Sequence, residues 1–161
     1  MVLDQQEQSE KLIEEFGRQI LVPGINEEGQ INISKKKICI IGLGALGTVA
    51  SQYLVRAGVG EIHLIDYDII EKSNLHRQIN YDKDDVGKSK SITSKHKLKN
   101  INDSTIIKEH SLNFQSFIKK NPNHNFDLIF DCTDNHQNKI FSSKYSKANK
   151  ISFVSISINS S

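Results

Sequence analysis

Three glycines, Gly42, Gly44 and Gly47, form a G-x-G-x-x-G pattern between a short apolar segment and a segment of helical periodicity. Glycines at this spacing permit a tight turn, let the backbone approach a phosphate, and let a helix pack closely on the preceding strand. The first turn of such a helix offers free N–H groups to an anion. Asp66 lies about twenty residues further on, where an acid can bind a ribose hydroxyl. The spacing therefore predicts a nucleotide-binding site.

The segments around these glycines have the pattern of a strand, a helix and a second strand. Residues 37–41 are apolar and β-branched, and residues 61–65 form a second strand pattern after Gly58 and Gly60. Between them, helical spacing predicts one buried face made of Leu46, Val49, Ala50, Tyr53, Leu54 and Ala57. A glycine turn that serves only packing is the alternative, and the position of Asp66 argues against it.

Helical and strand patterns alternate along the rest of the chain. Further helices are predicted over residues 9–20, 25–34 (interrupted at Gly29), 86–100, 114–119 and 135–148, and further strands over 104–109, 126–131 and 151–156. This order predicts an α/β fold, a Rossmann-like, doubly wound and mainly parallel sheet with helices on both faces. We expect a single domain over residues 1–161, with residues 1–34 as a helical arm within it.

Several polar residues follow the predicted strands or begin the predicted helices. They are Asp66, Asn74, Arg77, Lys90 and Asp134. The carboxyl ends of parallel strands share one edge of a sheet, where open α/β folds bind their ligands. A ribose-binding acid, phosphate-binding groups and a separate carboxylate can therefore converge there. A carboxylate near a triphosphate suits Mg²⁺, so the set favours ATP with Mg²⁺ over NAD.

The segment 67–78 is a long polar connection where a simple βαβ unit would begin a helix. Long loops in compact domains are often functional. It carries Arg77, one of three arginines among the 21 basic residues, and the planar guanidinium binds phosphate in a way that lysine cannot copy. Arg56 ends a helix, where a cation is favourable, whereas Arg18 and Arg77 lack such an explanation.

Composition excludes several classes of protein. The 161 residues are 37% hydrophobic and 25% charged, and the net charge of +2 is too small to indicate a nucleic-acid partner. No apolar run approaches the roughly 20 residues of a membrane span. The N-terminus lacks the apolar core of a signal peptide, so we expect a cytoplasmic protein. Cys39 and Cys132 lie outside any C-x-x-C pair, which predicts buried thiols and no zinc site.

Seven short segments resemble the family of adenylyltransferases that activate small ubiquitin-like proteins, the ThiF/MoeB/HesA type. The likeness is closest to the molybdopterin-synthase adenylyltransferase branch (MoeB type) and extends over nearly the whole chain. The segments are residues 18–20, 42–47, 50–54, 57–60, 73–78, 86–90 and 131–135. The S-N-L-H-R-Q and D-C-T-D-N sequences among them are far more specific than the glycine pattern.

The resemblance implies ATP-dependent adenylation of the C-terminal glycine carboxylate of a small ubiquitin-like sulfur-carrier protein, of the MoaD or ThiS type. It further implies a homodimer and a place in molybdenum-cofactor biosynthesis. The nucleotide-binding residues would be Gly42, Gly44, Ala45, Leu46, Gly47, Asp66, Ser73, Asn74, Leu75, His76, Arg77, Lys90, Asp134 and Asn135. The catalytic residues would be Arg18, Arg77, Lys90 and Asp134. Asp134 would hold Mg²⁺, and Arg18 would reach the ATP of the partner subunit.

The sequence departs from the family pattern in places. Ala45 stands where another glycine is usual, and Lys139 stands where arginine is usual. The chain ends at Ser161, roughly two-thirds of the way through the family's catalytic domain. We therefore expect the family's C-terminal third to be absent, and with it the paired C-x-x-C motifs that bind the structural zinc.

Two alternative functions stay open. The same fold could bind ATP without catalysis, as a decayed or regulatory module. It could also be an NAD-dependent oxidoreductase, although no residue stands out as an acid or base for hydride transfer. Single residues have alternatives as well, because Asp66 could serve NAD, Asp134 could cap its helix, and Lys88 and Lys90 could be surface lysines. For the lysines of residues 86–100, a solvated helix face is favoured over nucleic-acid binding.

Overall fold

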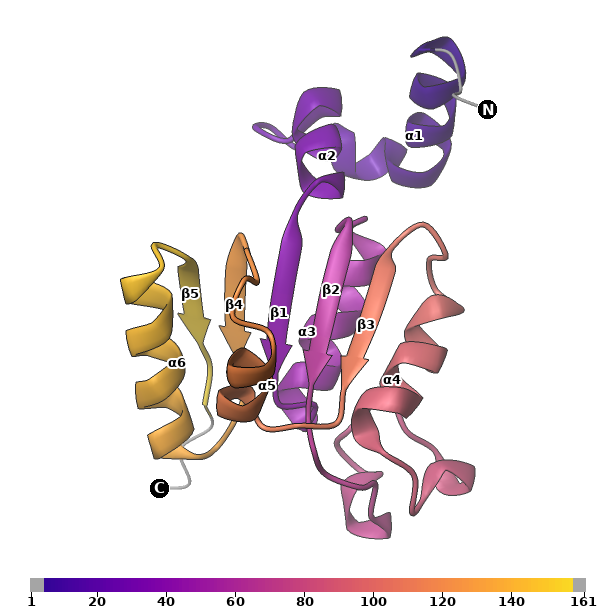
Figure 1. Ribbon diagram of the computed structural model, residues 1–161. Helices are drawn as coiled ribbons and strands as arrows, with labels where there is room; N and C mark the ends of the chain where they lie inside the picture. Colours follow the sequence, from indigo (N-terminus) through magenta and orange to yellow (C-terminus); the bar gives the residue numbers. More distant parts are fainter. Residues whose placement is uncertain (1–4, 158–161) are drawn as a thin grey trace.

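The computed structural model describes residues 5–157, with side chains described from residue 10. Five parallel strands form one sheet in the order β3-β2-β1-β4-β5 (Figure 1). The strands are β1 (Lys37–Ile41), β2 (Glu61–Ile65), β3 (Ile106–His110), β4 (Leu128–Asp131) and β5 (Ser152–Ser155). The helices are α1 (Gln5–Ile20), α2 (Asn26–Ser34), α3 (Ala45–Arg56), α4 (Lys90–Lys99), α5 (Phe114–Lys120) and α6 (His136–Ala148). The predicted Rossmann-like α/β fold is confirmed.

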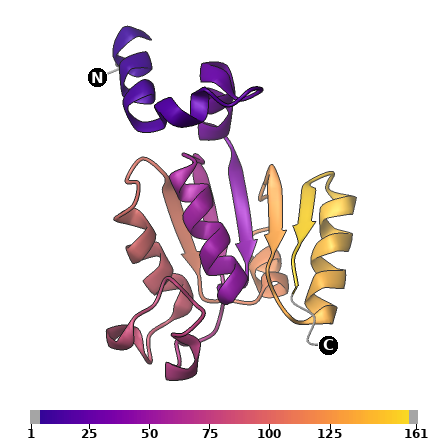
Figure 2. The same cartoon turned by 180° about the vertical axis from the view of Figure 1, so that it is seen from behind.

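Both faces of the sheet are buried, as a parallel sheet requires. On one face, Ile38 and Ile40 of β1 pack with residues of α3 and α4. On the other face, Cys39 and Ile41 of the same strand pack with the aromatic side chains of α5 and α6. Figures 1 and 2 show α3 and α5 on opposite sides of the sheet. The chain leaves β1 toward β2 and later returns to β4 on the other side, so β1 and β4 form the switch point of the sheet.

The predicted buried face of helix α3 is only partly correct. Val49 and Tyr53, predicted to be buried, are 37% and 70% exposed. The helix instead buries Gly47, Thr48 and Ser51, together with Val55. Leu46, Ala50 and Leu54 of the predicted face are partly buried and pack against the core. Small residues let the helix axis come close to the sheet, and Val49 and Tyr53 are left on the outer side.

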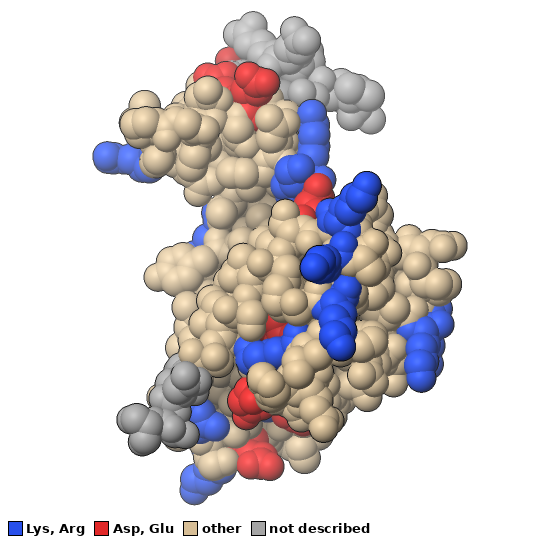
Figure 3. Space-filling view, turned by 90° about the vertical axis from the view of Figure 1, so that its left-hand side faces the viewer, with Lys and Arg blue, Asp and Glu red and all other residues tan. Residues whose placement is uncertain are grey.

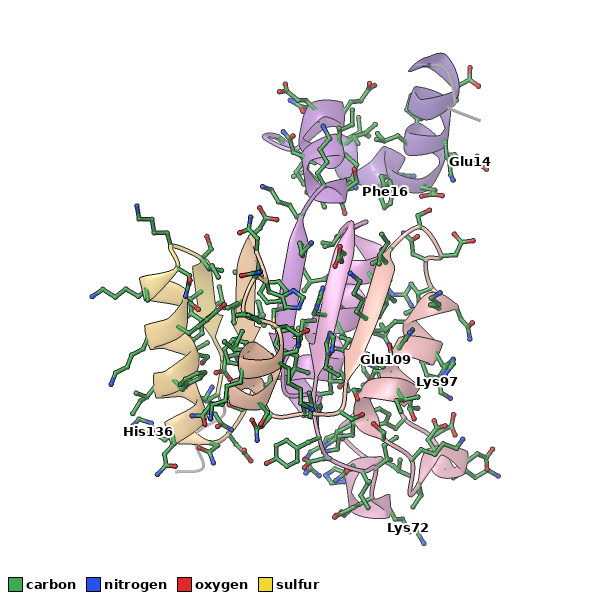
Figure 4. All side chains as sticks on the ribbon, viewed as in Figure 1. Glu14, Phe16, Lys72, Lys97, Glu109 and His136 are labelled. Atoms are coloured by element: carbon green, nitrogen blue, oxygen red, sulfur yellow. The ribbon has the colours of Figure 1, made fainter. Side chains whose placement is uncertain are left out.

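The arm formed by α1 and α2 lies at the amino ends of the strands (Figure 1). The side-chain amides of Gln19 and Gln30 donate to the carbonyl of Ala57, at 3.0 and 2.9 Å. This carbonyl follows the last turn of α3, where backbone oxygens lack helical partners. Phe16 packs on Gly58, where a β-carbon would lie 2.5 Å from the ring, and Figure 4 shows it between the arm and the sheet. No helix within residues 5–157 has the length and apolar character to cross a bilayer.

Two predicted helix boundaries are wrong. Helix α2 runs through Gly29 without interruption, and the N–H of Gly29 donates to Oδ1 of Asn26, the first residue of the helix, at 3.0 Å. Helix α4 begins at Lys90 rather than at residue 86, because the preceding residues form a turn that hydrogen-bonds to Ile70. Lys88 therefore precedes the helix.

Charged side chains are distributed unevenly over the surface. Lysines of α4 are paired, since Lys95 bonds Glu109 and Lys97 bonds both Asp82 and Asp85. At the opposite edge of the sheet, residues 135–157 contain four lysines and no acidic residue. Figure 3 shows this face, where basic side chains outnumber acidic ones.

Both cysteines are buried and unpaired, as predicted. Burial, followed by the negative charge of Asp131, raises the pKa of Cys39 and raises that of Cys132 to about 12. Both side chains are therefore neutral thiols at ordinary pH.

A histidine cluster lies under α5. His63 of β2 is fully buried, with its Nε2 at 2.7 Å from a carboxylate oxygen of Glu61 and its Nδ1 at 3.1 Å from Nε2 of His110. The rings of His124 and Phe117 pack against it. Because a carboxylate only accepts, His63 donates through Nε2–H and accepts from His110 at Nδ1. Burial lowers the pKa of His63 to about 4, although the contact with Glu61 raises it.

We predict an acid-dependent loss of stability that originates at His63. The unfolded chain takes up a proton at this residue near pH 6.5 and the folded chain only near pH 4, so stability falls as the pH drops through that window. Between pH 6.5 and 4.5 the loss is about 2–3 kcal/mol from this residue, at about 1.4 kcal/mol per pH unit. Urea unfolding at a series of pH values measures it.

His63→Gln should reduce this pH dependence, because glutamine can still donate to Glu61 and does not titrate, while His110 and His124, whose pKa values burial also lowers, keep a smaller part of it. Glu61 itself stays ionised in this window, since hydrogen bonds from Lys108 and His63 outweigh burial and lower its pKa to about 2. His136→Gln, at an exposed histidine (Figure 4), is the control and should leave the slope unchanged. Parallel curves for His63→Gln and the unmutated chain would contradict the assignment.

Candidate functional site

A cleft of about 560 Å³ opens at the carboxyl ends of β1, β2 and β4. Its walls come from the glycine loop, the end of β2 with the segment after it, the start of α4, and the loop between β4 and α6. Figure 4 shows Lys72, from the segment after β2, and His136, the first residue of α6, at this same end of the sheet. The cleft thus lies at the switch point, where such folds bind ligands.

The glycine loop has no room for side chains at two positions. Gly42 has φ +87°, a left-handed conformation that favours glycine. A β-carbon at Gly47 would lie 1.8 Å from the carbonyl oxygen of Gly42, so only glycine allows α3 to begin here. Gly44 is the N-cap of α3 and provides no side-chain cap. The first N–H groups of α3 are therefore available to a ligand.

Asp66 holds the glycine loop in place. Its Oδ2 accepts from the N–H of Leu43 at 2.6 Å, and its Oδ1 accepts from the N–H of Asp68 at 2.8 Å. Burial raises the pKa of Asp66, while these two hydrogen bonds lower it. Each carboxylate oxygen can accept a second hydrogen bond, so Asp66, which lines the cleft, can also receive a hydroxyl group. Tyr81 also contacts the glycine loop, since its hydroxyl donates to the carbonyl of Leu43 at 3.0 Å.

Lys90, the first residue of α4, lies in the cleft wall with 7% of its surface exposed. Its Nζ is 3.0 Å from Oδ2 of Asp68, whose side chain is half exposed. A nearly buried ammonium with one exposed partner can exchange that partner for a phosphate. Sequence analysis missed Asp68. Lys88 pairs with Asp85 and lies outside the cleft lining, so the two neighbouring lysines have different roles.

The segment 71–78 folds around Asn74. The side-chain oxygen of Asn74 accepts from the N–H of Glu71 at 3.1 Å. The main-chain carbonyl of Asn74 accepts from the N–H groups of Arg77 and Gln78. Arg77 donates from Nη1 to the carbonyl of Ser73 at 2.8 Å and lines the cleft with Asn74. Four residues of the predicted nucleotide set do not line the cleft: Gly47, Ser73, Leu75 and His76. Each of them lies in the same segment as residues that do line the cleft.

Gln78 belongs to the S-N-L-H-R-Q segment that resembles the family, although it is not among the predicted site residues. It is 3% exposed and lines the cleft beside Gly44. Its Oε1 has no hydrogen-bond partner within residues 5–157. An unpaired buried acceptor costs about 1–3 kcal/mol, and a ligand with a donor group would remove that cost.

Helix α6 is capped by Asn135, not by Asp134 or Thr133. The Asn135 side chain accepts from the N–H groups of Gln137 and Asn138, at 2.9 and 3.1 Å. Asp134 is exposed, lines the cleft, and makes no hydrogen bond or ion pair within the described part of the chain. Its carboxylate is therefore available to a cation.

The residues present fit Mg²⁺ only in the way that nucleotide sites use it. Residues 5–157 contain no group of three or more metal-binding side chains. Mg²⁺ in such sites takes one or two carboxylates, water and phosphate oxygens from the nucleotide. Asp134 fits that requirement as a single protein ligand.

Arg18 is not part of the cleft of its own chain. Its neighbour Gln19 bonds Ala57 at the C-terminal end of α3, whereas the cleft lies at the N-terminal end. Helix α3 has 12 residues, so these ends are about 18 Å apart at 1.5 Å per residue. Within one chain the structure brings together all predicted catalytic residues except Arg18.

Comparison with known sequences finds one family. The sequence model of the ThiF family matches residues 16–160. The chain is 33% identical over 120 residues to the adenylyltransferase and sulfurtransferase MOCS3 of Xenopus laevis, and 38% identical over 122 residues to that of Caenorhabditis briggsae. These matches cover 74% of this chain but only 27% and 30% of the relatives. The chain thus spans less than a third of the length of the curated relatives it matches.

Solved structures share the fold. The E. coli tRNA N6-threonylcarbamoyladenosine dehydratase TcdA matches with a TM-score of 0.82 and 25% identity, over 91% of this chain and 61% of that one. E. coli MccB matches with a TM-score of 0.71 and 31% identity, over 78% and 38%. TcdA has also been solved in complex with ATP.

The cap assignment gives a prediction for stability. Asn135→Ala should lower the free energy of unfolding by about 1 kcal/mol, because two N–H groups of α6 lose their acceptor. Asp134→Ala should change it by less than about 0.5 kcal/mol, because Asp134 has no partner to lose. Urea unfolding of the two variants compares them directly. If Asp134→Ala were the more damaging change, Asp134 would be the helix cap and not a free carboxylate.

Proposed function

Because the chain belongs to the ThiF family, we propose that it is an ATP-dependent adenylyltransferase that activates the C-terminal carboxylate of a small ubiquitin-like sulfur-carrier protein, of the MoaD or ThiS type. The curated relatives are named adenylyltransferase and sulfurtransferase, which supports both the reaction and the sulfur carrier. Molybdenum-cofactor biosynthesis is the pathway that the sequence resemblance favours, and the cytoplasm is the expected location.

The observation that carries this proposal is the free carboxylate of Asp134 in the same cleft as two cations and the glycine loop. A triphosphate beside the first turn of α3 would meet its free N–H groups. Lys90 and Arg77 lie in the wall of the same cleft and carry the charges that pyrophosphate needs. Asp66 would take a ribose hydroxyl with the acceptor positions that the loop leaves free.

The reaction needs little from the protein beyond positioning and charge. A carboxylate oxygen of the carrier attacks the α-phosphorus, the bond from that phosphorus to the bridging oxygen breaks, and pyrophosphate leaves with its electrons. The carrier carboxylate is already ionised, so no protein base is required. Arg77 and Lys90 would stabilise the charge that grows on the leaving group. Mg²⁺ held by Asp134 would add neutralisation of the phosphates.

Helix α3 supports the proposal of a homodimer. Val49 and Tyr53 are exposed apolar residues on it, and Gln52 of the same helix bonds Asn80, the residue after the exposed Ile79, at 3.0 Å. An apolar face of this kind is typical of an interface. A two-fold axis perpendicular to the middle of α3 would exchange its two ends. The partner subunit's arm would then lie beside this chain's cleft and bring the partner subunit's Arg18 to the ATP.

We predict that Mg-ATP stabilises the chain against heat more than NAD does. A ligand at 100 times its dissociation constant adds about 2.7 kcal/mol, which a melting curve detects. NADP should be weakest, because Asp66 would repel its 2′-phosphate. Lys90→Met should remove most of the ATP shift, whereas Lys88→Met, at the exposed lysine outside the cleft, should keep it.

Two outcomes would favour the alternatives. A larger shift with NAD than with Mg-ATP would indicate an NAD-dependent oxidoreductase. Binding of ATP without ATP–pyrophosphate exchange in the presence of the carrier would indicate a nucleotide-binding module without catalysis.

Mixed dimers test the role of Arg18. Arg18→Ala and Asp134→Asn should each reduce ATP–pyrophosphate exchange by about two orders of magnitude, since each removes a charge from every site. In heterodimers of the two variants, one site keeps Asp134 and receives an intact Arg18 from the other subunit. Random mixing at equal amounts should therefore restore about a quarter of the unmutated activity. No recovery, in a preparation shown to contain heterodimers, would contradict action across the interface.

A further inference from the structure

Asp131, the last residue of β4, is fully buried although it carries a carboxylate. Its Oδ1 accepts from the N–H of Thr133 at 3.0 Å and from the Thr133 hydroxyl at 2.7 Å. Its Oδ2 accepts from the hydroxyl of Ser142 in α6. No lysine, arginine or histidine within residues 5–157 forms an ion pair with it. Burying a carboxylate without a cationic partner lowers the stability of the folded state. We therefore expect Asp131 to have a specific role.

The loop that Asp131 holds packs against the glycine loop. A β-carbon at Gly42 would lie 3.1 Å from Cγ2 of Thr133 and 3.2 Å from the carbonyl carbon of Cys132. The N–H of Cys132 donates to the carbonyl of Ile41 at 2.8 Å. Residues 132 and 133 are thus fixed to β1, to the glycine loop and, through Asp131, to α6.

Asp134 is the next residue, and nothing fixes its own side chain. It has no hydrogen bond within the described residues, and the α6 cap belongs to Asn135. The position of its carboxylate therefore depends on the backbone of Thr133, which Asp131 holds at both the N–H and the hydroxyl.

We propose that Asp131 is a positioning residue, which fixes the loop 132–134 so that Asp134 presents its carboxylate to Mg²⁺ beside the glycine loop. This inference rests on the proposed function. Residues that orient a metal ligand typically contribute about 10–100-fold to metal affinity or activity. A role in the stability of α6 alone does not account for Asp131, because the helix has its own cap and Ser142 lies in its second turn.

The test measures how much Mg²⁺ strengthens ATP binding to the full chain, as the ratio of ATP dissociation constants without and with Mg²⁺ in calorimetric titrations. Asp131→Ala should reduce this ratio by about tenfold or more and leave ATP affinity without Mg²⁺ nearly unchanged. Asp134→Asn should reduce it equally. The double variant should show no further loss, because both changes remove one interaction.

Asp131→Asn is the conservative variant. Its amide oxygen can accept both hydrogen bonds from Thr133, and its NH₂ group can donate to Ser142, whose hydroxyl then donates to the carbonyl of Asn138 as it already can at 3.0 Å. It should keep the Mg²⁺ effect within about twofold of the unmutated chain. If Asp131→Asn behaved like Asp131→Ala, positioning by hydrogen bonds would be wrong.

Thr133→Val decides the matter if Asp131→Ala does not fold. Valine keeps the methyl contact with Gly42 and the backbone hydrogen bond, and loses only the hydroxyl. It should lower the Mg²⁺ effect at least about twofold, and an unchanged effect would overturn the inference. Ser146→Ala is the matched control, since Ser146 is a buried serine one turn further along α6 whose hydroxyl bonds only within its helix.

The remaining outcomes separate this inference from the proposed function. If Asp131→Ala weakened ATP binding equally with and without Mg²⁺, Asp131 would be merely structural, and the adenylyltransferase proposal would stand. If the unmutated chain bound no ATP, or bound it without any effect of Mg²⁺, both proposals would be wrong.

Discussion

The contact between Gly47 and the carbonyl of Gly42 is the constraint on which the rest of the structure depends. With a β-carbon 1.8 Å from that oxygen, no other residue lets α3 start so close to β1. The close start brings Thr48 and Ser51 onto the sheet and turns Tyr53 outward. It also leaves the first N–H groups of α3 open at the switch point, because Gly44 adds no cap. The packing of α3 on the sheet, the side chains that α3 exposes and its open first turn thus all follow from the close approach of α3 to β1.

The fold could be predicted from the sequence because strand and helix periods alternate clearly and glycines mark the first turn. The side of α3 that faces the sheet could be predicted only in part, since Leu46 and Leu54 pack on the core but Val49 and Tyr53 do not. Helical spacing identifies an apolar stripe, but a close approach also brings small side chains, Thr48 and Ser51, into the contact. The spacing of the glycines indicates that α3 lies close to the sheet. The exposure of Tyr53 can therefore be predicted only when the glycine spacing is combined with the helical periodicity.

The residues that line the candidate site could be predicted from their types and positions, whereas their contacts could be predicted less well. Asp66, Asn74, Arg77, Lys90 and Asp134 all line the cleft, as expected from their places after strands. The partner of Lys90 and the cap of α6 were missed, because both depend on loop conformations that carry no periodic signal. Asp68 lies two residues after Asp66, and Asn135 was predicted only as a nucleotide-binding residue beside Asp134, so the path of the backbone decides their roles.

Charge in the cleft places a limit on what it can bind alone. Four carboxylates line it, from Asp66, Asp68, Glu71 and Asp134, against the two cations of Arg77 and Lys90. The start of α3 adds only about half a positive charge, so the cleft by itself does not balance a triphosphate. Under the proposed function, Asp134 resolves this imbalance by supplying a ligand for Mg²⁺ instead of a charge that opposes the nucleotide. A carboxylate in such a position is useful only if its placement is reliable, which is why the buried contacts of Asp131 behind it matter to the chemistry as well as to the fold.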